Sequence, residues 1–192
     1  MLNKIVLDLE TQKEFAAVGG RNANHKLRVS VCGVYSYVED QYLCCDEKNL
    51  TKLGDMLQTT DLVIGYNIKQ FDLAVLQPYF NFPMASVPVL DILEEVEKSL
   101  GHRIRLEAIA QATLGEGKTG SGLAAINLWK AGKLEELKTY CLNDVKLTKE
   151  IYEYGRQNGK VLFQDFFETR EIAVNFPEPV PRVGARVQSS LF

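Results

Sequence analysis

Two carboxylates interrupt an apolar segment near the start of the chain. The segment KIVLDLET, residues 4–11, places Asp8 and Glu10 among aliphatic residues that favour a buried strand. Side chains two positions apart lie on the same face of a strand, so both acids point to the side of Val6. Two neighbouring negative charges are costly to bury unless a divalent cation neutralises them. The alternative is an exposed strand end at which water solvates both groups.

A third acid, Asp72, follows a second apolar segment, VIGYNIKQFDLAVL, at residues 63–76. It falls in the first turn of an expected helix, where the helix dipole alone favours a negative charge. The dipole does not explain the polar Asn67 and the aromatic Phe71 at the exit of the preceding strand. These two residues therefore indicate a functional segment.

A fourth acid lies on an apolar helix face. In the segment at 133–155, steps of three and four residues define a stripe that consists of Leu137, Cys141, Leu147, Ile151 and Tyr154. The same spacing puts Tyr140 and Asp144 on this stripe, one helical turn apart. A buried aspartate without a partner is uncommon, and the stripe carries no lysine or arginine. We therefore expect Asp144 to meet the other carboxylates around metal.

The order of these motifs resembles that of the DEDD superfamily of 3′–5′ exonucleases, which includes polymerase proofreading domains. The resemblance covers residues 3 to 155 and has three parts: D-x-E in the first strand, N-x-x-x-F-D after a later strand and Y-x-x-x-D in a late helix. Its residues are Asp8, Glu10, Asn67, Phe71, Asp72, Tyr140 and Asp144. One subtype has a histidine five positions before the last acid. Thr139 stands there, so the chain looks like the tyrosine subtype.

The resemblance implies a ribonuclease H-like fold and two divalent ions, Mg²⁺ or Mn²⁺, between the four acids. It implies that Asp8 bridges both ions and that Glu10 and Asp144 complete the site of the ion that binds the nucleophile. It also implies that Asp72 supports the second ion largely through water. Tyr140 would orient the attacking water by its hydroxyl, since a phenol with a pKa of about 10 is a poor base at neutral pH.

Three further residues are candidates for substrate binding. Asn67 could contact the terminal sugar or phosphate, and Phe71 could stack on a base; the alternative for Phe71 is a core position under the helix. Lys118 lies in LGEGKTGSGL, residues 114–123, which could be a flap near the phosphates or a solvated linker. The segment departs from a Walker A loop, because Ala112 stands in place of its first glycine and a helix precedes it.

Strands and helices alternate in a way that can position these residues. We expect strands over 3–9, 27–38, 41–45, 61–67 and 87–92, the second and third forming a hairpin. We expect helices over 47–58, 69–80, 92–100, 105–114, 122–131 and 134–156, with Asp46 as an N-cap and Asp91 and Glu94 forming a capping box. The pattern predicts an α/β fold with a mixed five-stranded sheet flanked by helices.

Composition restricts the function further. The chain has 192 residues, 46% of them hydrophobic and 24% charged, which is typical of a globular domain. A net charge of −3 argues against binding a polyanion by bulk charge, so a nucleic-acid contact must be local or depend on metal ions. No apolar segment approaches the roughly 20 residues that span a bilayer. The N-terminus lacks the features of a signal peptide, and we expect a cytoplasmic protein with no membrane partner.

The cysteines and histidines do not suggest a zinc site. The four cysteines have no C-x-x-C spacing, and we expect free thiols with Cys32 and Cys141 in the core. His25 and His102 are expected at the surface.

The C-terminal segment carries a separate signal. We expect an exonuclease domain over 1–172 and an extended tail over 173–192. In the tail, Gln188, Leu191 and Phe192 match a Q-x-x-L-F pattern that resembles the sliding-clamp-binding peptides of bacterial replication and repair proteins. Ser189 departs from the usual leucine. A chance match and a tail packed on its own domain are the alternatives.

The sequence therefore predicts a metal-dependent 3′–5′ exonuclease acting on single-stranded DNA ends. An RNA exonuclease is one alternative, because the acids do not distinguish the sugars. A catalytically silent nucleic-acid-binding scaffold is another, although all four acids are present.

Overall fold

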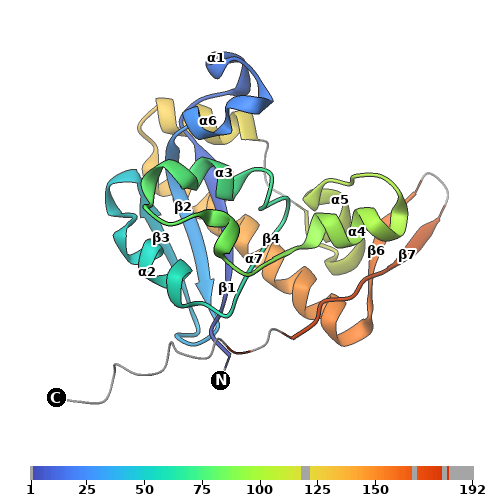
Figure 1. Cartoon of the computed structure of the whole chain (residues 1–192). Helices are drawn as coiled ribbons and strands as arrows, with labels where there is room; N and C mark the ends of the chain where they lie inside the picture. Colours follow the sequence, from blue (N-terminus) through green and yellow to red (C-terminus); the bar gives the residue numbers. More distant parts are fainter. Residues whose placement is uncertain (1, 118–121, 166–167, 179–180, 182–192) are drawn as a thin grey trace.

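A five-stranded mixed sheet forms the centre of the molecule (Figure 1). The computed structural model describes residues 2–117, 122–165, 168–178 and 181. The strands are β1 (Lys4–Thr11), β2 (Val29–Ser36), β3 (Gln41–Asp46), β4 (Leu62–Gly65) and β5 (Val89–Asp91), in the order β3-β2-β1-β4-β5. β2 pairs antiparallel with both β1 and β3, whereas β4 pairs parallel with β1 and with β5. The predicted α/β fold with a mixed five-stranded sheet flanked by helices is confirmed.

The helices lie close to where the sequence predicted them, with local differences. They are α2 (Thr51–Thr59), α3 (Asp72–Leu76), α4 (Ile92–Leu100), α5 (Leu106–Leu114), α6 (Gly122–Lys130) and α7 (Leu134–Asn158). Short 3₁₀ turns are η1 (Arg21–Lys26), η2 (Glu47–Asn49), η3 (Gln77–Tyr79) and η4 (Met84–Ser86). The helix expected over 69–80 is only α3 followed by η3, because Pro78 ends regular helix there. The segment between β1 and β2 contains α1 (Phe15–Val18) and η1.

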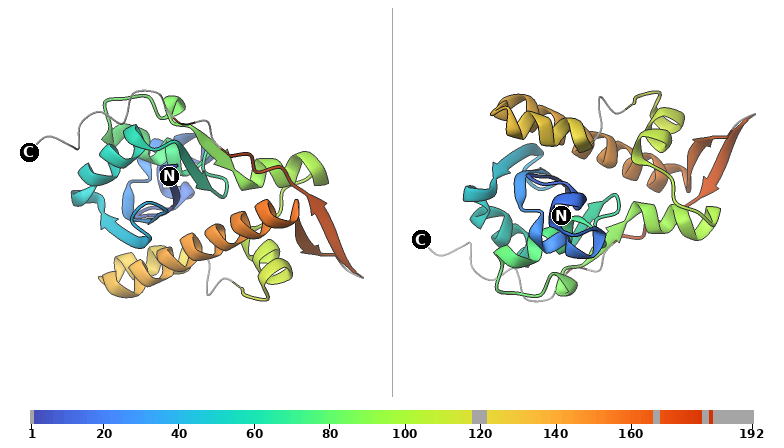
Figure 2. Two further views of the ribbon diagram at one scale, coloured as in Figure 1. Left: turned by 90° about the horizontal axis from the view of Figure 1, so that it is seen from below. Right: turned by 90° about the horizontal axis from the view of Figure 1, so that it is seen from above.

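The two faces of β1 belong to different cores. Ile5, Leu7 and Leu9 are buried against α2 and α3, whereas Val6 packs with residues of α4, α5 and α7. Figure 2 shows α7 along one side of the sheet and α2 on the other. Because side chains alternate along a strand, Asp8 and Glu10 share the α7 side with Val6. Burial of α7 follows the predicted stripe, except that Tyr152 is fully buried and Tyr154 only partly.

A second sheet beyond α7 was not predicted. β6 (Lys160–Gln164) and β7 (Thr169–Ala173) form an antiparallel pair at the far end of α7 (Figure 1). Phe176, in the predicted tail, is buried and stacks on Tyr152 with ring centroids 5.8 Å apart. The chain is therefore packed on the domain as far as Phe176. The proposed boundary at 172 stays a prediction.

Smaller expectations have mixed outcomes. Cys32 and Cys141 are buried, His25 and His102 are exposed, and all four cysteines are free thiols, as predicted. Asp91 caps α4 by accepting a hydrogen bond from the Leu93 N–H, but the Glu94 carboxylate pairs with Lys69 at 2.5 Å instead of completing a capping box. Within the described part of the chain, no helix combines the length and apolar character needed to span a bilayer.

Candidate active site

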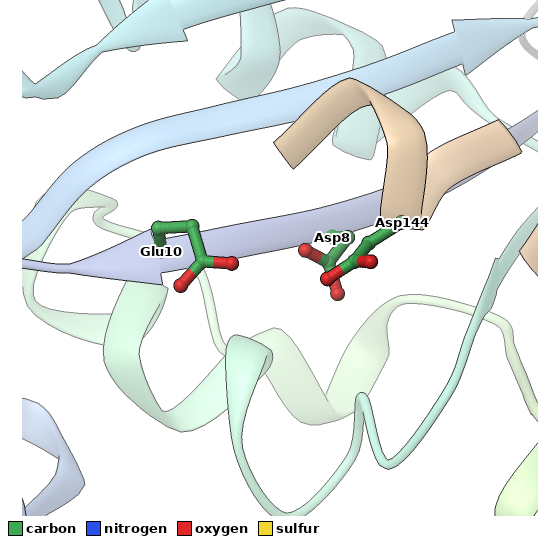
Figure 3. A group of neighbouring side chains, drawn as sticks. All are labelled: Asp8, Glu10 and Asp144. Atoms are coloured by element: carbon green, nitrogen blue, oxygen red, sulfur yellow. The ribbon is translucent and has the colours of Figure 1, made fainter. Parts of the chain in front are cut away.

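Three predicted carboxylates meet between β1 and α7. Oxygen atoms of Asp8, Glu10 and Asp144 lie within 4.8 Å of one another, and Figure 3 shows the Asp8 and Asp144 carboxylates side by side. Asp144 is 1% exposed and Glu10 is 8% exposed. Residues more than 130 positions apart in sequence thus form one acidic cluster. The alternation of side chains along β1 and the helical stripe of α7 together predicted this convergence.

Gly33 permits this close approach of helix and sheet. It pairs with Asp8 across β1 and β2, so its missing side chain would point to the same face as Asp8. A Cβ atom at Gly33 would lie 2.9 Å from Val145 Cγ2 and 3.1 Å from Cys141 Sγ. Only a residue without a side chain lets α7 lie this near the sheet. Cys141 Sγ in turn approaches the Asp8 carbonyl oxygen at 3.5 Å.

The fourth acid, Asp72, reaches the site from the first residue of α3. β4 pairs with β1 only as far as Val6, so beyond Val6 this edge of β1 pairs with no strand of the described residues. Asp72 Oδ1 accepts a hydrogen bond from the Leu9 N–H at 3.0 Å at this edge. The carboxyl is 3% exposed, and its burial, together with the charge of Asp8, raises its pKa well above the ordinary value.

The acids open onto one cavity of about 590 Å³. Its lining includes Asp8, Glu10, Phe71, Asp72 and Asp144 among the predicted residues. Lys13, Glu14, Phe15, Arg21, Tyr66, Arg105 and Leu123 also line it. The cavity therefore combines carboxylates with cationic, aromatic and aliphatic side chains.

Tyr140 lies one turn before Asp144 on α7. It is 7% exposed and packs in a cluster with Val31, Ala125, Leu137 and Cys141. Among the described residues it is not one of those that line the cavity. A water-orienting role for its hydroxyl stays a prediction.

Phe71 lies both at the core and at the cavity, and its stacking on a base stays a prediction. It is half-buried and packs against the core cluster under α3, and it also lines the cavity. Its ring meets the Phe15 ring edge-on, with centroids 5.8 Å apart. An aromatic pair thus borders the acids.

Asn67 lies in a turn after β4. Its backbone is left-handed, with φ of 64°, and its N–H donates to Asp91 Oδ1 at 2.8 Å. Its side-chain oxygen accepts a hydrogen bond from Arg103. Asn67 is not among the described residues that line the cavity. Its backbone forms a turn that the hydrogen bond to Asp91 stabilises. Its contact with substrate stays a prediction, and Lys118 lies outside the described residues.

The donor set suits a hard divalent cation. Carboxylate oxygens are the preferred ligands of Mg²⁺ and Mn²⁺. The raised pKa of Asp72 shows that its charge is costly in this buried position. A bound cation would remove that cost, and the cluster of Asp8, Glu10 and Asp144 could bind it.

Sequence reasoning missed several residues that build or border the site. Gly33 could have been found only from the strand register, because a single glycine in an apolar strand has many explanations. Arg21 and Arg105 gave no periodic signal. Tyr66 stands beside the N-x-x-x-F-D motif, yet its neighbours in space come from distant segments.

Comparison with known proteins identifies the family of the chain. No curated protein that was compared matches the chain. A family model described as the RNase_H superfamily matches residues 6–156, the part that holds all four acids. The match confirms the predicted ribonuclease H-like fold, and the superfamily suggests a nuclease-type function. The chain therefore belongs to the RNase_H superfamily.

Proposed function

We propose that this protein is a metal-dependent 3′–5′ exonuclease that hydrolyses single-stranded DNA from its 3′ end. The observation that carries the proposal is the convergence of Asp8, Glu10 and Asp144 within 4.8 Å at a cavity that Asp72 also lines. The order of the D-x-E, N-x-x-x-F-D and Y-x-x-x-D motifs supports this reaction over other nuclease reactions. A cytoplasmic location is part of the same proposal.

The residues would divide the work in a defined way. Asp8, Glu10, Asp72 and Asp144 would hold two divalent ions, Mg²⁺ or Mn²⁺. When bound, such ions increase the acidity of the attacking water and stabilise the leaving oxygen. Tyr140 would orient that water through its hydroxyl. Phe71 would stack on the terminal base, and Asn67 and Lys118 would contact the terminal nucleotide or its phosphate.

The deciding experiment uses single-stranded DNA and RNA of the same sequence, each labelled at the 5′ end. The purified protein is incubated with Mg²⁺, Mn²⁺ or EDTA. The proposal expects a ladder of products shortened from the 3′ end with metal and none with EDTA. The Asp8→Asn variant, purified identically, controls for contaminating nucleases. Faster shortening of RNA would make the protein an RNA exonuclease, and binding without hydrolysis would indicate a silent scaffold.

A further inference from the structure

Among the described residues, several cations that form no ion pair lie at or near the acidic cavity. Across the described residues, most lysines and arginines contact a carboxylate. Within that same part of the chain, the exceptions are Lys13, Arg21, Lys26, Lys48 and Arg105. Lys13, Arg21 and Arg105 line the cavity, and Lys26 ends the same η1 segment as Arg21. The chain as a whole has a net charge of −3, so the cationic character near the cavity is a local feature.

Arg21 is held over the aromatic pair of the cavity. Its guanidinium carbon lies 5.6 Å from the centre of the Phe15 ring, and Phe15 meets Phe71 edge-on. Asn24 Nδ2 donates to the Gln70 carbonyl at 2.7 Å, which ties η1 to the segment before Asp72. The cation is therefore positioned relative to the acids, although it is exposed.

Arg105 reaches the same cavity from a separate element. The Tyr66 hydroxyl donates to the Ile104 carbonyl at 2.8 Å, and the Ile104 side chain is buried. This contact fixes the backbone next to Arg105, which is the N-cap residue of α5. Arg105 is exposed and lines the cavity together with Tyr66.

The remaining lining indicates the class of ligand. Leu123 is 59% exposed, the most exposed large hydrophobic residue in the described part, and it lines the cavity with Phe15 and Phe71. Exposed apolar and aromatic surface beside arginines suits bases linked by phosphates better than a free inorganic phosphate.

We propose that Arg21 and Arg105 bind backbone phosphates of the single-stranded substrate upstream of its terminal nucleotide. This inference rests on the proposed exonuclease function. It assigns the preference for a polynucleotide over a mononucleotide to these two arginines. Arginine forms paired, charge-assisted hydrogen bonds with phosphate, and such contacts set the register of the strand. Both residues are positioning residues, because neither is assigned to the reacting phosphate.

The test compares two substrates that share a scissile phosphodiester. One is a single-stranded oligonucleotide, and the other is the p-nitrophenyl ester of thymidine 5′-monophosphate, which has no upstream phosphate. The variants are Arg21→Gln, Arg105→Gln and their combination. Lys48→Gln is the matched control, because Lys48 is an exposed cation that lies outside the cavity and pairs with no carboxylate in the described part of the chain.

Each arginine variant should raise KM for the oligonucleotide about threefold to tenfold at low salt and leave kcat unchanged. Kinetics on the p-nitrophenyl ester should equal those of the wild type. The dependence of log KM on log salt should become shallower by about 0.7 for each phosphate that no longer meets an arginine, as expected for a single strand. Lys48→Gln should behave as the wild type in all three measurements.

Two results would overturn the inference. One is that the arginine variants have the same oligonucleotide KM and salt slope as Lys48→Gln. The other is an equal decrease in rate on both substrates, which would place the arginines at the reacting phosphate or in the fold. If the wild type hydrolyses neither substrate, the exonuclease proposal fails instead. Fluorescence anisotropy of a labelled oligonucleotide, with the Asp8→Asn protein and the same arginine changes, then tests the phosphate contacts by Kd and its salt slope.

Discussion

At the scale of single residues, the acidic cluster is the most consequential feature. Asp144 and Glu10 are nearly inaccessible, and Asp8 lies within 4.8 Å of both. Like charges at this separation destabilise the folded state unless a partner of opposite charge is present. If the cluster binds metal as proposed, metal binding should stabilise the folded chain.

Metal should raise the melting temperature. A ligand at a hundredfold excess over its Kd adds about 2.7 kcal/mol to the free energy of unfolding, which corresponds to about 5–10 °C in a domain of this size. Thermal unfolding with and without Mn²⁺ should show this shift for the wild type and for Asp55→Ala, an exposed acid on α2. Asp8→Ala should show a much smaller shift. Equal shifts in all three proteins would contradict a metal site at Asp8.

Tyr140 tests whether catalysis can be separated from metal binding. Tyr140→Phe keeps the ring that packs against Leu137 and Cys141 and removes only the hydroxyl. If that hydroxyl orients the water, kcat should fall by about 10²-fold while the Mn²⁺-induced rise in melting temperature remains. Asp144→Asn should lose both. A Tyr140→Phe enzyme with unchanged kcat would show that the ring is only a packing element.

At the scale of elements, the position of α7 against β1 and β2 decides the geometry of the site. α7 contributes Tyr140 and Asp144, and it lies close to the sheet because Gly33 has no side chain. The approach of α7 to the acids of β1 thus depends on its packing against β2, a strand that carries none of the predicted catalytic residues.

Gly33→Ala should lower stability and activity together. The added methyl group would lie 2.9 Å from Val145 Cγ2, so α7 or its side chains must shift. Overpacking of this kind costs about 1–3 kcal/mol, and the displaced Asp144 should lower kcat. Melting temperature and initial rates measure the two effects. Gly122→Ala is the stability control, because a Cβ there meets nothing within 4 Å.

Glu47 connects the start of β2 with its neighbours and should make stability depend on pH. Its carboxylate accepts hydrogen bonds from Gln12, Arg28 and Tyr79, and chiefly the contact with Arg28 lowers its pKa to about 2. Its contribution is therefore complete above the unfolded pKa of about 4.3 and is lost as the pH falls through about 2.

Urea unfolding of Glu47→Gln measures that contribution. The variant should be less stable than the wild type near neutral pH, and the difference should shrink as the pH approaches about 2. Glu168→Gln, a change at an exposed side chain, should track the wild type throughout. A difference that is constant with pH would mean that Glu47 acts by packing and not by charge.

At the scale of the whole molecule, the family match and the predicted C-terminal peptide occupy different parts of the sequence. The family match ends at residue 156, and Gln188, Leu191 and Phe192 lie outside the described residues. We propose that this peptide binds a bacterial sliding clamp, with Leu191 and Phe192 as apolar anchors and Gln188 hydrogen-bonded beside them.

Deletion of residues 188–192 should leave hydrolysis of short oligonucleotides unchanged, because the four acids lie far upstream. Calorimetric titration with the sliding clamp should show binding by the full chain and none by the deletion variant. Ser189→Leu should tighten binding, since it adds apolar area at the anchor. An intact chain that does not bind the clamp, or a deletion that prevents folding, would make the segment structural and weaken the preference for DNA.

The sequence alone predicted the five strands of the central sheet, most of the helices and the direction of the key side chains. Alternation in β1 put Asp8 and Glu10 on one face, and the helical stripe of α7 turned Asp144 inward, because local periodicity decides which face a residue occupies. Boundaries were less certain where proline or short 3₁₀ turns interrupt a helix, as after Asp72. The hairpin of β6 and β7 has a weak alternating pattern, including Val161 and Phe163, that could have been found.

Only the tertiary structure decided which distant residues meet. The hydrogen bond from Leu9 to Asp72 depends on β4 ending its pairing at Val6, and the place of Asp144 depends on the register that puts Gly33 beside Asp8. The gathering of Arg21 and Arg105 at the acids likewise joins segments with no common pattern. Contacts of this kind arise from strand register and helix packing, which no local sequence periodicity encodes.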